Sequence, residues 1–275
     1  MKKKLKAKWL GGDEGTMDLG IAGKSAIICA SSQGLGKACA LALAEEGVRV
    51  YINGRDLKKL KLTAIEINQS TGTDIIPVAA DINTEDGRNK LLAACKAPDI
   101  LVNNNSGPPP GTFEDWSHAD WMEGIEANMI APIMMIKGVI EGMEARRWGR
   151  IVNITSAMVK APTPRMGLST GARAGLTALS KSLSRRVVKN NVTINNLLPE
   201  RIDSPRQVYM AELQAKNENI SYEEARERIA GNLAAKRMGL TEEFGAACAF
   251  LCSTKSGYIS GQNLQLDGGT YPGVM

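Results

Sequence analysis

The stretch AIICASSQGLGKACALALAEEG, residues 26–47, predicts a buried β-strand that leads directly into an α-helix. Its first five residues are apolar, Gly34 and Gly36 follow at the turn, and a segment rich in Ala and Leu continues to Gly47. Glycines at such a turn let the backbone approach a phosphate group, whose negative charge then lies at the helix N-terminus. The stretch therefore predicts a strand-turn-helix unit of the kind that binds a dinucleotide.

The same alternation of apolar and helical segments continues along the chain. Strands that do not alternate with polar residues are buried on both faces, as in a parallel sheet covered by helices. We therefore predict one α/β domain over residues 17–275, a Rossmann-type, doubly wound, seven-stranded parallel sheet with helices on both faces. The expected strands are 26–30, 48–53, 75–80, 99–103, 150–155, 192–198 and 263–266. The expected helices are 35–46, 56–69, 84–96, 119–146, 169–189 and 241–252, with N-cap signals at Asp56, Thr84 and Thr241.

A polar segment, 200–235, interrupts this pattern between the sixth and seventh strands. Its composition predicts helices, and its place after a strand puts it at the carboxyl edge of the sheet, where ligands bind in such folds. We expect it to be a helical lid over a substrate.

The charge of the chain is concentrated at its beginning. The 275 residues have a net charge of +5, and residues 1–16, with five lysines and two acids, carry +3 of it. We interpret residues 1–16 as a disordered leader or a start-site artefact, with a membrane or nucleic-acid tether as the alternative. Because the remaining chain is nearly neutral, neither a nucleic acid nor a membrane is expected as a partner.

Histidine and cysteine usage excludes further classes of function. The single histidine, His118, makes a serine-hydrolase triad improbable, and no metal site is expected. None of the five cysteines forms a CxxC pair, and Cys248 and Cys252 lie one helical turn apart among apolar residues, which predicts core packing. A reduced, cytoplasmic protein is expected.

Several motifs occur in the order in which the short-chain dehydrogenase/reductase family has them, and the chain resembles that family over residues 20–270. The first turn matches the family's TGxxxGxG pattern at two glycines but has Ala30 in place of the first. The segment NNNSG, 103–107, is similar to the family's NNAG turn, and NNLLPERIDSP, 195–205, is similar to its NxxxPGxIxT segment. The resemblance implies an oxidoreductase that binds a nicotinamide dinucleotide.

The resemblance also implies the residues of both sites. Asn128 and Ser156 match the catalytic asparagine and serine of the family, and Asp81 matches its adenine-contacting acid. The implied cofactor-binding residues are Ala30, Ser32, Gln33, Gly34, Leu35, Gly36, Asn53, Arg55, Asp81, Ile82, Asn104, Asn105, Ser106, Arg173, Ile202 and Ser204.

The largest departure from the family lies at the reaction centre. Where the family has a Tyr-x-x-x-Lys pair, this chain has Ser169 and Arg173. A serine hydroxyl is a far weaker acid than a tyrosine, and arginine stays charged, so neither relays protons as the family's pair does. Ser169 can still bind a carbonyl oxygen, and Arg173 can hold ribose hydroxyls and stabilise negative charge. Glu200, at the family's PG turn, and Tyr209, in the expected lid, are candidate replacement acids.

The end of the second strand predicts the choice of cofactor. An acid there would bind the ribose diol of NAD, but this chain offers Asn53 and Arg55. Arg55 can pair with a ribose 2′-phosphate, so NADP(H) is favoured over NAD(H); a solvated loop arginine is the alternative.

Three hypotheses for the function remain open on the sequence. The first is NADPH-dependent reduction of a small ketone, similar to 3-oxoacyl-carrier-protein reductases, with catalytic Asn128, Ser156, Ser169 and Arg173. The others are a cofactor-binding pseudo-enzyme and a non-redox lyase or dehydratase on the same scaffold. The resemblance further implies a homo-oligomer, a dimer or tetramer, through the helices near 119–146 and 169–189.

Overall fold

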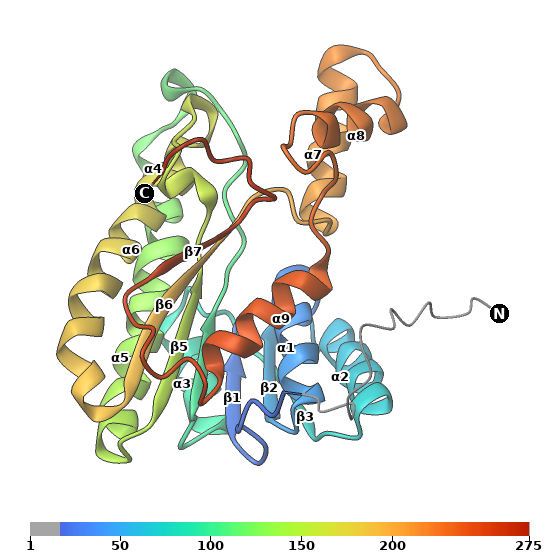
Figure 1. The fold of residues 1–275 in the computed structure, drawn as a ribbon. Coiled ribbons are helices and arrows are strands. Elements are labelled where there is room, and N and C mark those ends of the chain that lie inside the picture. Colours follow the sequence, from blue (N-terminus) through green and yellow to red (C-terminus); the bar gives the residue numbers. More distant parts are fainter. Residues whose placement is uncertain (1–16, 275) are drawn as a thin grey trace.

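Seven parallel strands form one sheet in the computed structural model, which describes residues 17–274 (Figure 1). The strand order is β3-β2-β1-β4-β5-β6-β7, so the order reverses between β1 and β4. The strands are β1 (Ser25–Ile28), β2 (Arg49–Gly54), β3 (Ile75–Ala79), β4 (Ile100–Asn103), β5 (Gly149–Ile154), β6 (Val192–Pro199) and β7 (Asn263–Leu266). The predicted fold is confirmed, and each predicted strand is found within two residues of its expected bounds. The segment interpreted as a leader, 1–16, lies outside the described residues.

Two hydrophobic clusters cover the two faces of this sheet. One cluster packs the helices α1 (Gly34–Glu45), α2 (Leu57–Thr71) and α9 (Thr241–Cys252) against β1, β2 and β4. The other packs α3 (Glu85–Ala94), α5 (Ala131–Ala145) and α6 (Gly167–Val187) on the opposite face. Cys39, Cys248 and Cys252 are free thiols buried in the first cluster, as core packing predicts.

Two of the three predicted helix caps are found. The Asp56 carboxylate accepts hydrogen bonds from the N–H groups of Lys58 and Lys59, and the Thr84 hydroxyl accepts one from Gly87. The prediction for Thr241 is wrong by one residue, because Leu240 occupies the N-cap position of α9. A carboxylate replaces the expected hydroxyl there, since Oε2 of Glu243 accepts the N–H of Leu240 at 2.7 Å.

The helix predicted over 119–146 is not one regular α-helix. The structure has α4 (His118–Ile125), a π-helical turn (Glu126–Ile130) and then α5. A π-helical turn adds one residue to the turn and is frequent at functional sites. This turn contains the candidate catalytic residue Asn128.

Buried asparagines connect four neighbouring strands through their side chains. Nδ2 of Asn103 donates to Oδ1 of Asn153, which lies beside it in the register of β4 and β5, at 2.9 Å. Asn153 donates in turn to Asn196 on β6 at 3.0 Å, and Asn196 donates to Asn263 on β7 at 2.8 Å. Ser180 of α6 accepts a further hydrogen bond from Asn153 at 3.0 Å. Because a shift of one residue would leave these amides without partners, the ladder favours a single strand register.

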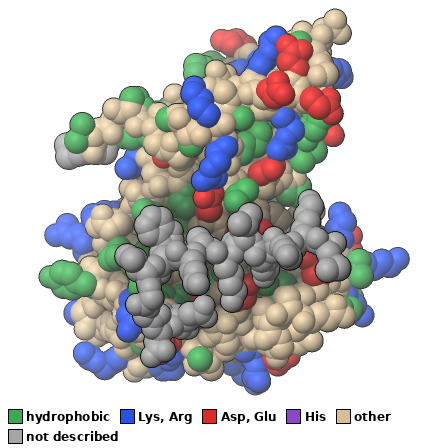
Figure 2. All heavy atoms as spheres, turned by 45° about the vertical axis from the view of Figure 1, so that its right-hand side comes forward, with side chains coloured by type: hydrophobic (Ala, Val, Ile, Leu, Met, Phe, Trp, Pro, Cys, Tyr) green, Lys and Arg blue, Asp and Glu red, His purple; other side chains and the backbone are tan. Residues whose placement is uncertain are grey.

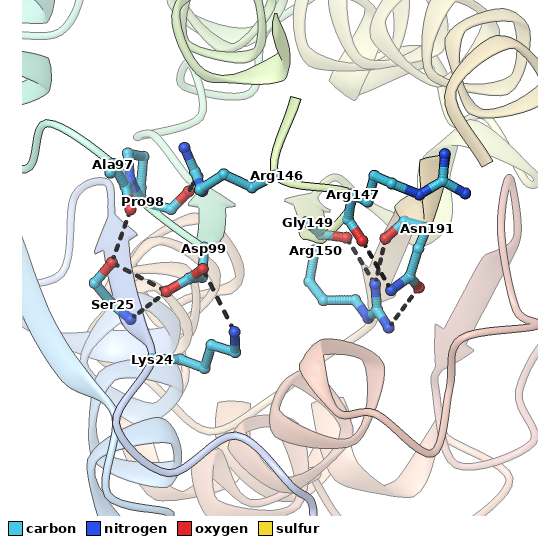
Figure 3. A network of polar contacts seen from close by, with 10 residues as sticks. All are labelled: Lys24, Ser25, Ala97, Pro98, Asp99, Arg146, Arg147, Gly149, Arg150 and Asn191. Atoms are coloured by element: carbon cyan, nitrogen blue, oxygen red, sulfur yellow. Dashed lines mark hydrogen bonds and ion pairs between the residues drawn. The ribbon is translucent and has the colours of Figure 1, made fainter. Parts of the chain in front are cut away.

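Polar contacts also join the opposite, amino-terminal ends of the strands (Figure 3). The Asp99 carboxylate accepts the N–H of Ser25 at 3.0 Å and lies 3.7 Å from Nζ of Lys24. The Arg150 guanidinium donates to the carbonyl of Asn191 at 2.9 Å and to that of Gly149 at 2.8 Å. This edge of the sheet is therefore occupied by structural contacts, and the opposite edge is left for ligands.

The segment predicted as a lid forms two helices, α7 (Pro205–Glu218) and α8 (Tyr222–Gly231), after the carboxyl end of β6. Figure 1 shows this pair, in orange, standing away from the sheet. It has its own small apolar cluster around Ala211 and Ile229. Figure 2 shows acidic and basic side chains side by side in its upper part. Within this helix pair, Arg228 pairs with Glu218 and Glu224.

Candidate active site

The turn after β1 is shaped by close backbone contacts. A methyl group on Gly36 would lie 2.5 Å from the Ala30 carbonyl oxygen and 2.8 Å from Cα of Ser31, so only glycine fits there. Ser31 is buried, and its hydroxyl donates to the Ile28 carbonyl and accepts the N–H of Asn53. Ala30 has a φ of +43°, in the region that favours glycine, which accounts for the glycine of the family pattern.

The N-terminus of α1 is open toward this turn. Gln33 is the N-cap residue, it is exposed, and its side chain makes no capping hydrogen bond. The N–H groups of the first turn, at Gly34, Leu35 and Gly36, therefore lack side-chain partners and can bind a phosphate. Opposite Gly34 lie Ser204 and Pro205 of the lid, 3.9 and 3.7 Å from where a Cβ would be.

The two candidates at the end of β2 differ in what they can do. The Asn53 side chain is buried, and its Nδ2 donates to the carbonyls of Val78 and Ala80 at 3.2 and 3.0 Å. Asn53 therefore fixes β2 against β3 and has little capacity left for a ligand. Arg55 is exposed and has no ion pair or hydrogen bond among the residues that the structure describes, so its guanidinium can reach a phosphate.

The loops after β3 and β4 contact one another at the same edge. The Asp81 carboxylate accepts the N–H of Asn83, whose side chain accepts a hydrogen bond from Asn105 at 2.7 Å. Asn104 donates to the Ala30 carbonyl at 3.0 Å, which joins this loop to the first turn. Of the other predicted cofactor-binding residues, Ser106 is exposed, whereas Ile82 and Ile202 are buried. The Ser32 carbonyl accepts a hydrogen bond from the Thr63 hydroxyl.

The four candidate catalytic residues come from different elements. Ser169 and Arg173 lie one turn apart on α6 and are 4% and 8% exposed, and Nε of Arg173 donates to Oγ of Ser169 at 3.1 Å. Arg173 also donates to the Ile154 carbonyl, at the end of β5, at 2.6 Å. Ser156 follows that strand, and its Oγ accepts the N–H of Met158.

Arg173 is an uncommon buried cation. Burial lowers its pKa to about 10, with a further lowering by the positive charge of Arg206, so it stays charged at neutral pH. Its hydrogen-bond acceptors are hydroxyl and carbonyl oxygens, and no carboxylate pairs with it within residues 17–274.

Asn128 has unused hydrogen-bonding capacity. Its Nδ2 donates to the Ser106 carbonyl at 3.2 Å, but its buried Oδ1 has no partner among the described residues. A small cavity of about 10 Å³ lies beside it and is also lined by Arg173 and Asn105. Such a cavity holds about one water, which would satisfy Oδ1.

The candidate replacement acids are only partly suited to that role. Glu200 is largely buried, which raises its pKa, while its ion pair with Arg201 at 3.2 Å opposes that effect. Tyr209 lies on the lid, is 43% exposed and has its ring 5.4 Å from the Arg206 guanidinium. Neither makes a hydrogen bond to Ser169 or Arg173.

Sequence reasoning missed two features of this site. The π-helical turn around Asn128 continues the apolar pattern of the neighbouring helices, so the sequence has no signal for it. Arg206, at the start of the lid, donates to the Pro108 carbonyl at 3.1 Å, and nothing in the polar lid sequence singled it out.

Comparisons with known proteins find relatives over nearly the whole chain. A family profile described as enoyl-(acyl carrier protein) reductase matches residues 29–271. The NADPH-dependent reductase BacG of Bacillus subtilis (strain 168) is 32% identical over 256 residues, which cover 91% of this chain and 99% of BacG. The 3-oxoacyl-[acyl-carrier-protein] reductase FabG of Aquifex aeolicus (strain VF5) is 28% identical, over 93% of this chain and 100% of FabG. L-sorbose reductase from Gluconobacter frateurii, solved with NADPH and L-sorbose, superposes with a TM-score of 0.89 at 28% identity, over 94% of this chain and 100% of the reductase.

The chain belongs to the short-chain dehydrogenase/reductase family. The prediction of an oxidoreductase of this family is thereby confirmed, and the NADPH in the descriptions of BacG and the sorbose reductase agrees with the preference predicted for NADP(H). No helix within residues 17–274 is long and apolar enough to cross a membrane. Within the same residues, no group of three or more His, Cys, Asp and Glu side chains is placed to hold a metal ion.

Proposed function

We propose that this protein reduces a small ketone to an alcohol with NADPH, at a reaction centre built from Asn128, Ser156, Ser169 and Arg173. The observation that carries the proposal is the hydrogen bond from Nε of Arg173 to Oγ of Ser169, at the position of the family's Tyr-x-x-x-Lys pair. The relatives FabG and L-sorbose reductase are named for the reduction of a 3-oxoacyl group and of a ketose, so a ketone is the common substrate class.

The residues at the carboxyl edge fit a bound NADPH. The uncapped N-terminus of α1 offers N–H groups to the pyrophosphate, and the missing side chain of Gly36 lets the turn pack closely. Arg55 has its guanidinium free of protein partners within the described residues and would hold the ribose 2′-phosphate. When bound, NADPH supplies the hydride for the carbonyl carbon.

The serines bind the carbonyl oxygen, and Arg173 stabilises the charge that develops there. Since Oγ of Ser156 already accepts from Met158, and Oγ of Ser169 already accepts from Arg173, both O–H groups remain as donors. The proton that completes the alcohol leaves Oγ of Ser169, and the adjacent guanidinium stabilises the resulting alkoxide. Asn128 holds a water in the cavity beside Arg173, and this water gives a proton to Oγ of Ser169 while it takes one up from the solvent.

NADPH oxidation, followed by its absorbance with a panel of ketones that includes a 3-oxoacyl thioester and L-sorbose, tests this proposal. We expect Ser169→Ala to lower kcat by a factor of about 10²–10⁴, the usual contribution of a proton donor. Ser70→Ala is the control, because Ser70 is exposed on α2, outside the reaction centre and outside α4, α5 and α6, and it should leave kcat unchanged.

Three results would contradict the proposal. An unchanged turnover in Ser169→Ala would show that Ser169 is not the proton donor. NADPH binding without turnover of any ketone would favour a cofactor-binding pseudo-enzyme. Conversion of a substrate without consumption of NADPH would favour a lyase or dehydratase.

We also propose that the protein assembles into a homo-oligomer through α4, α5 and α6, as the family resemblance implies. The described surface of α6 has a shallow hollow lined by Ala178, Lys181, Ser182, Arg185 and Arg186, which a second copy could fill. Light scattering after size-exclusion chromatography tests this, and a monomer at micromolar concentration would contradict it.

A further inference from the structure

Two arginines lie at consecutive residues of the proline-rich loop. A methyl group on Gly107 would lie 3.8 Å from Nη2 of Arg173 and 4.0 Å from Oγ of Ser169. The carbonyl of the next residue, Pro108, accepts a hydrogen bond from Nη2 of Arg206, on the lid helix α7, at 3.1 Å. Two guanidiniums, one from α6 and one from α7, therefore meet this part of the loop beside the reaction centre, near enough that the charge of Arg206 acts on Arg173.

No acid of the described chain neutralises either guanidinium. Neither Arg173 nor Arg206 has a carboxylate oxygen within 4.0 Å, although acids are present on the same segment. Glu200 is instead paired with Arg201 at 3.2 Å, and Asp203 with Arg226 at 2.8 Å. Arg201 and Arg226 thus have acidic partners, whereas Arg173 and Arg206 have none among the described residues.

This arrangement costs free energy in the absence of a ligand. Burial lowers the pKa of both guanidiniums, and the charge of Arg206 lowers that of Arg173 further. A buried charge is ordinarily paired, because desolvation without a partner is unfavourable. An anion near both guanidiniums would relieve the desolvation and the repulsion together, and arginine binds carboxylates with two parallel hydrogen bonds.

We infer that Arg173 and Arg206 bind a carboxylate of the substrate, so that the ketone reduced by this enzyme is a keto acid. The inference rests on the proposed function for the position of the ketone. In that proposal Ser169 binds the carbonyl oxygen, and Oγ of Ser169 accepts a hydrogen bond from Arg173. The carboxylate consequently belongs to the same small molecule, within a few bonds of the carbonyl carbon. Binding of the carboxylate by Arg206 also holds the lid helix against the loop.

Binding to the protein saturated with NADP⁺ tests the inference, because the oxidised cofactor cannot reduce a ketone. Calorimetric titration with 4-oxopentanoate and with its methyl ester compares one ketone with and without a carboxylate. We expect the acid to bind at least about tenfold more tightly than the ester. One charge-assisted hydrogen bond is enough to provide this difference in affinity. Arg206→Gln should abolish this difference without changing the affinity for NADP⁺.

Lys216→Gln is the matched control, because Lys216 is exposed on the same helix, has no ion pair within the described residues and changes the net charge equally. It should preserve the preference for the acid. Equal affinity for acid and ester in the unaltered protein would overturn the inference. So would an Arg206→Gln variant that loses affinity for NADP⁺ and keeps the preference, since Arg206 would then serve the cofactor.

The two proposals fail in different ways. Turnover of neutral ketones with no preference for a carboxylate would refute the keto-acid inference and leave the reductase proposal standing. Tight binding of 4-oxopentanoate without turnover of any ketone would refute the reductase proposal and leave the carboxylate-binding inference standing.

Discussion

Replacement of Gly36 by alanine tests whether the turn after β1 is as tightly packed as the structure shows. The added Cβ would lie 2.5 Å from the Ala30 carbonyl oxygen, 2.8 Å from Cα of Ser31 and 3.0 Å from the Ala30 carbonyl carbon. An ordinary contact is 3.4–4 Å, and all three atoms belong to the backbone, so no side-chain rotation can make room. The turn must therefore move by about 1 Å.

The structure gives the magnitude of this effect. A movement of that size strains the hydrogen bonds from Nδ2 of Asn104 to the Ala30 carbonyl, at 3.0 Å, and from the Ser31 N–H to the Asn53 carbonyl, at 2.7 Å. Overpacking of this kind costs about 1–3 kcal/mol. For a domain of this size each kcal/mol lowers Tm by roughly 2–4 °C, so we expect a decrease of roughly 2–12 °C.

The affinity for NADPH should fall more clearly than the stability. Displacing one N–H donor from a phosphate removes a charge-assisted hydrogen bond of about 1.5–3 kcal/mol, which corresponds to at least a tenfold rise in Kd. Fluorescence titration with NADPH measures the affinity, and thermal unfolding measures Tm. Gly231→Ala is the control, because nothing lies within 4 Å of its added Cβ. An unchanged Kd and Tm in Gly36→Ala would refute the close approach of this turn to the cofactor.

Three further changes test other parts of the structure. Arg55→Ala should weaken NADPH binding roughly ten- to a hundredfold and leave NADH binding unchanged, because the 2′-phosphate loses a charged partner. Lys58→Ala is the neighbouring control, and an equal effect of Arg55→Ala on both cofactors would contradict the role of Arg55. Asn153→Ala should lower the free energy of unfolding by roughly 3–9 kcal/mol in urea titrations, since three buried polar groups each lose a partner at about 1–3 kcal/mol. The hydrogen bonds from Arg237 and the helix N-terminus lower the pKa of Glu243 to about 2, so its contribution to stability is present above pH 4.5 and is lost as the pH falls toward 2. Glu243→Gln should therefore be less stable than the unaltered protein at pH 7, with the difference disappearing near pH 2.

The sheet could be predicted from the sequence because its strands are buried on both faces. Such strands appear as continuous apolar runs, and the run IVNIT, for example, ends within one residue of where β5 ends. The asparagine within that run was not recognised as part of a ladder. Its partners come from strands about 40 and 50 residues away, and only the register of the assembled sheet brings them together.

Part of the reaction centre could be predicted because its residues lie at fixed distances along the chain from recognisable motifs. Ser156, Ser169 and Arg173 were located by their distance along the chain from recognisable motifs, and α6 brings Ser169 and Arg173 into contact. Arg206 could not be located in this way, because its role depends on how the lid approaches the proline-rich loop. That approach is a tertiary contact between segments 98 residues apart, and neither segment has a pattern that specifies the other.

The replacement of the family's tyrosine and lysine changes how the reaction centre can work. A guanidinium with a pKa of about 10 keeps its charge throughout the neutral range, so Arg173 cannot relay a proton but can stabilise an alkoxide at any working pH. Such stabilisation is effective only where water is excluded, because water screens the charge. Ser169 and Arg173 are themselves buried, and α7 brings a second positive charge, Arg206, to the loop beside Ser169. A neutral ketone would leave Arg206 without an acidic partner, whereas a keto acid would neutralise it. The charges of Arg173 and Arg206 together therefore favour a substrate that carries its own negative charge.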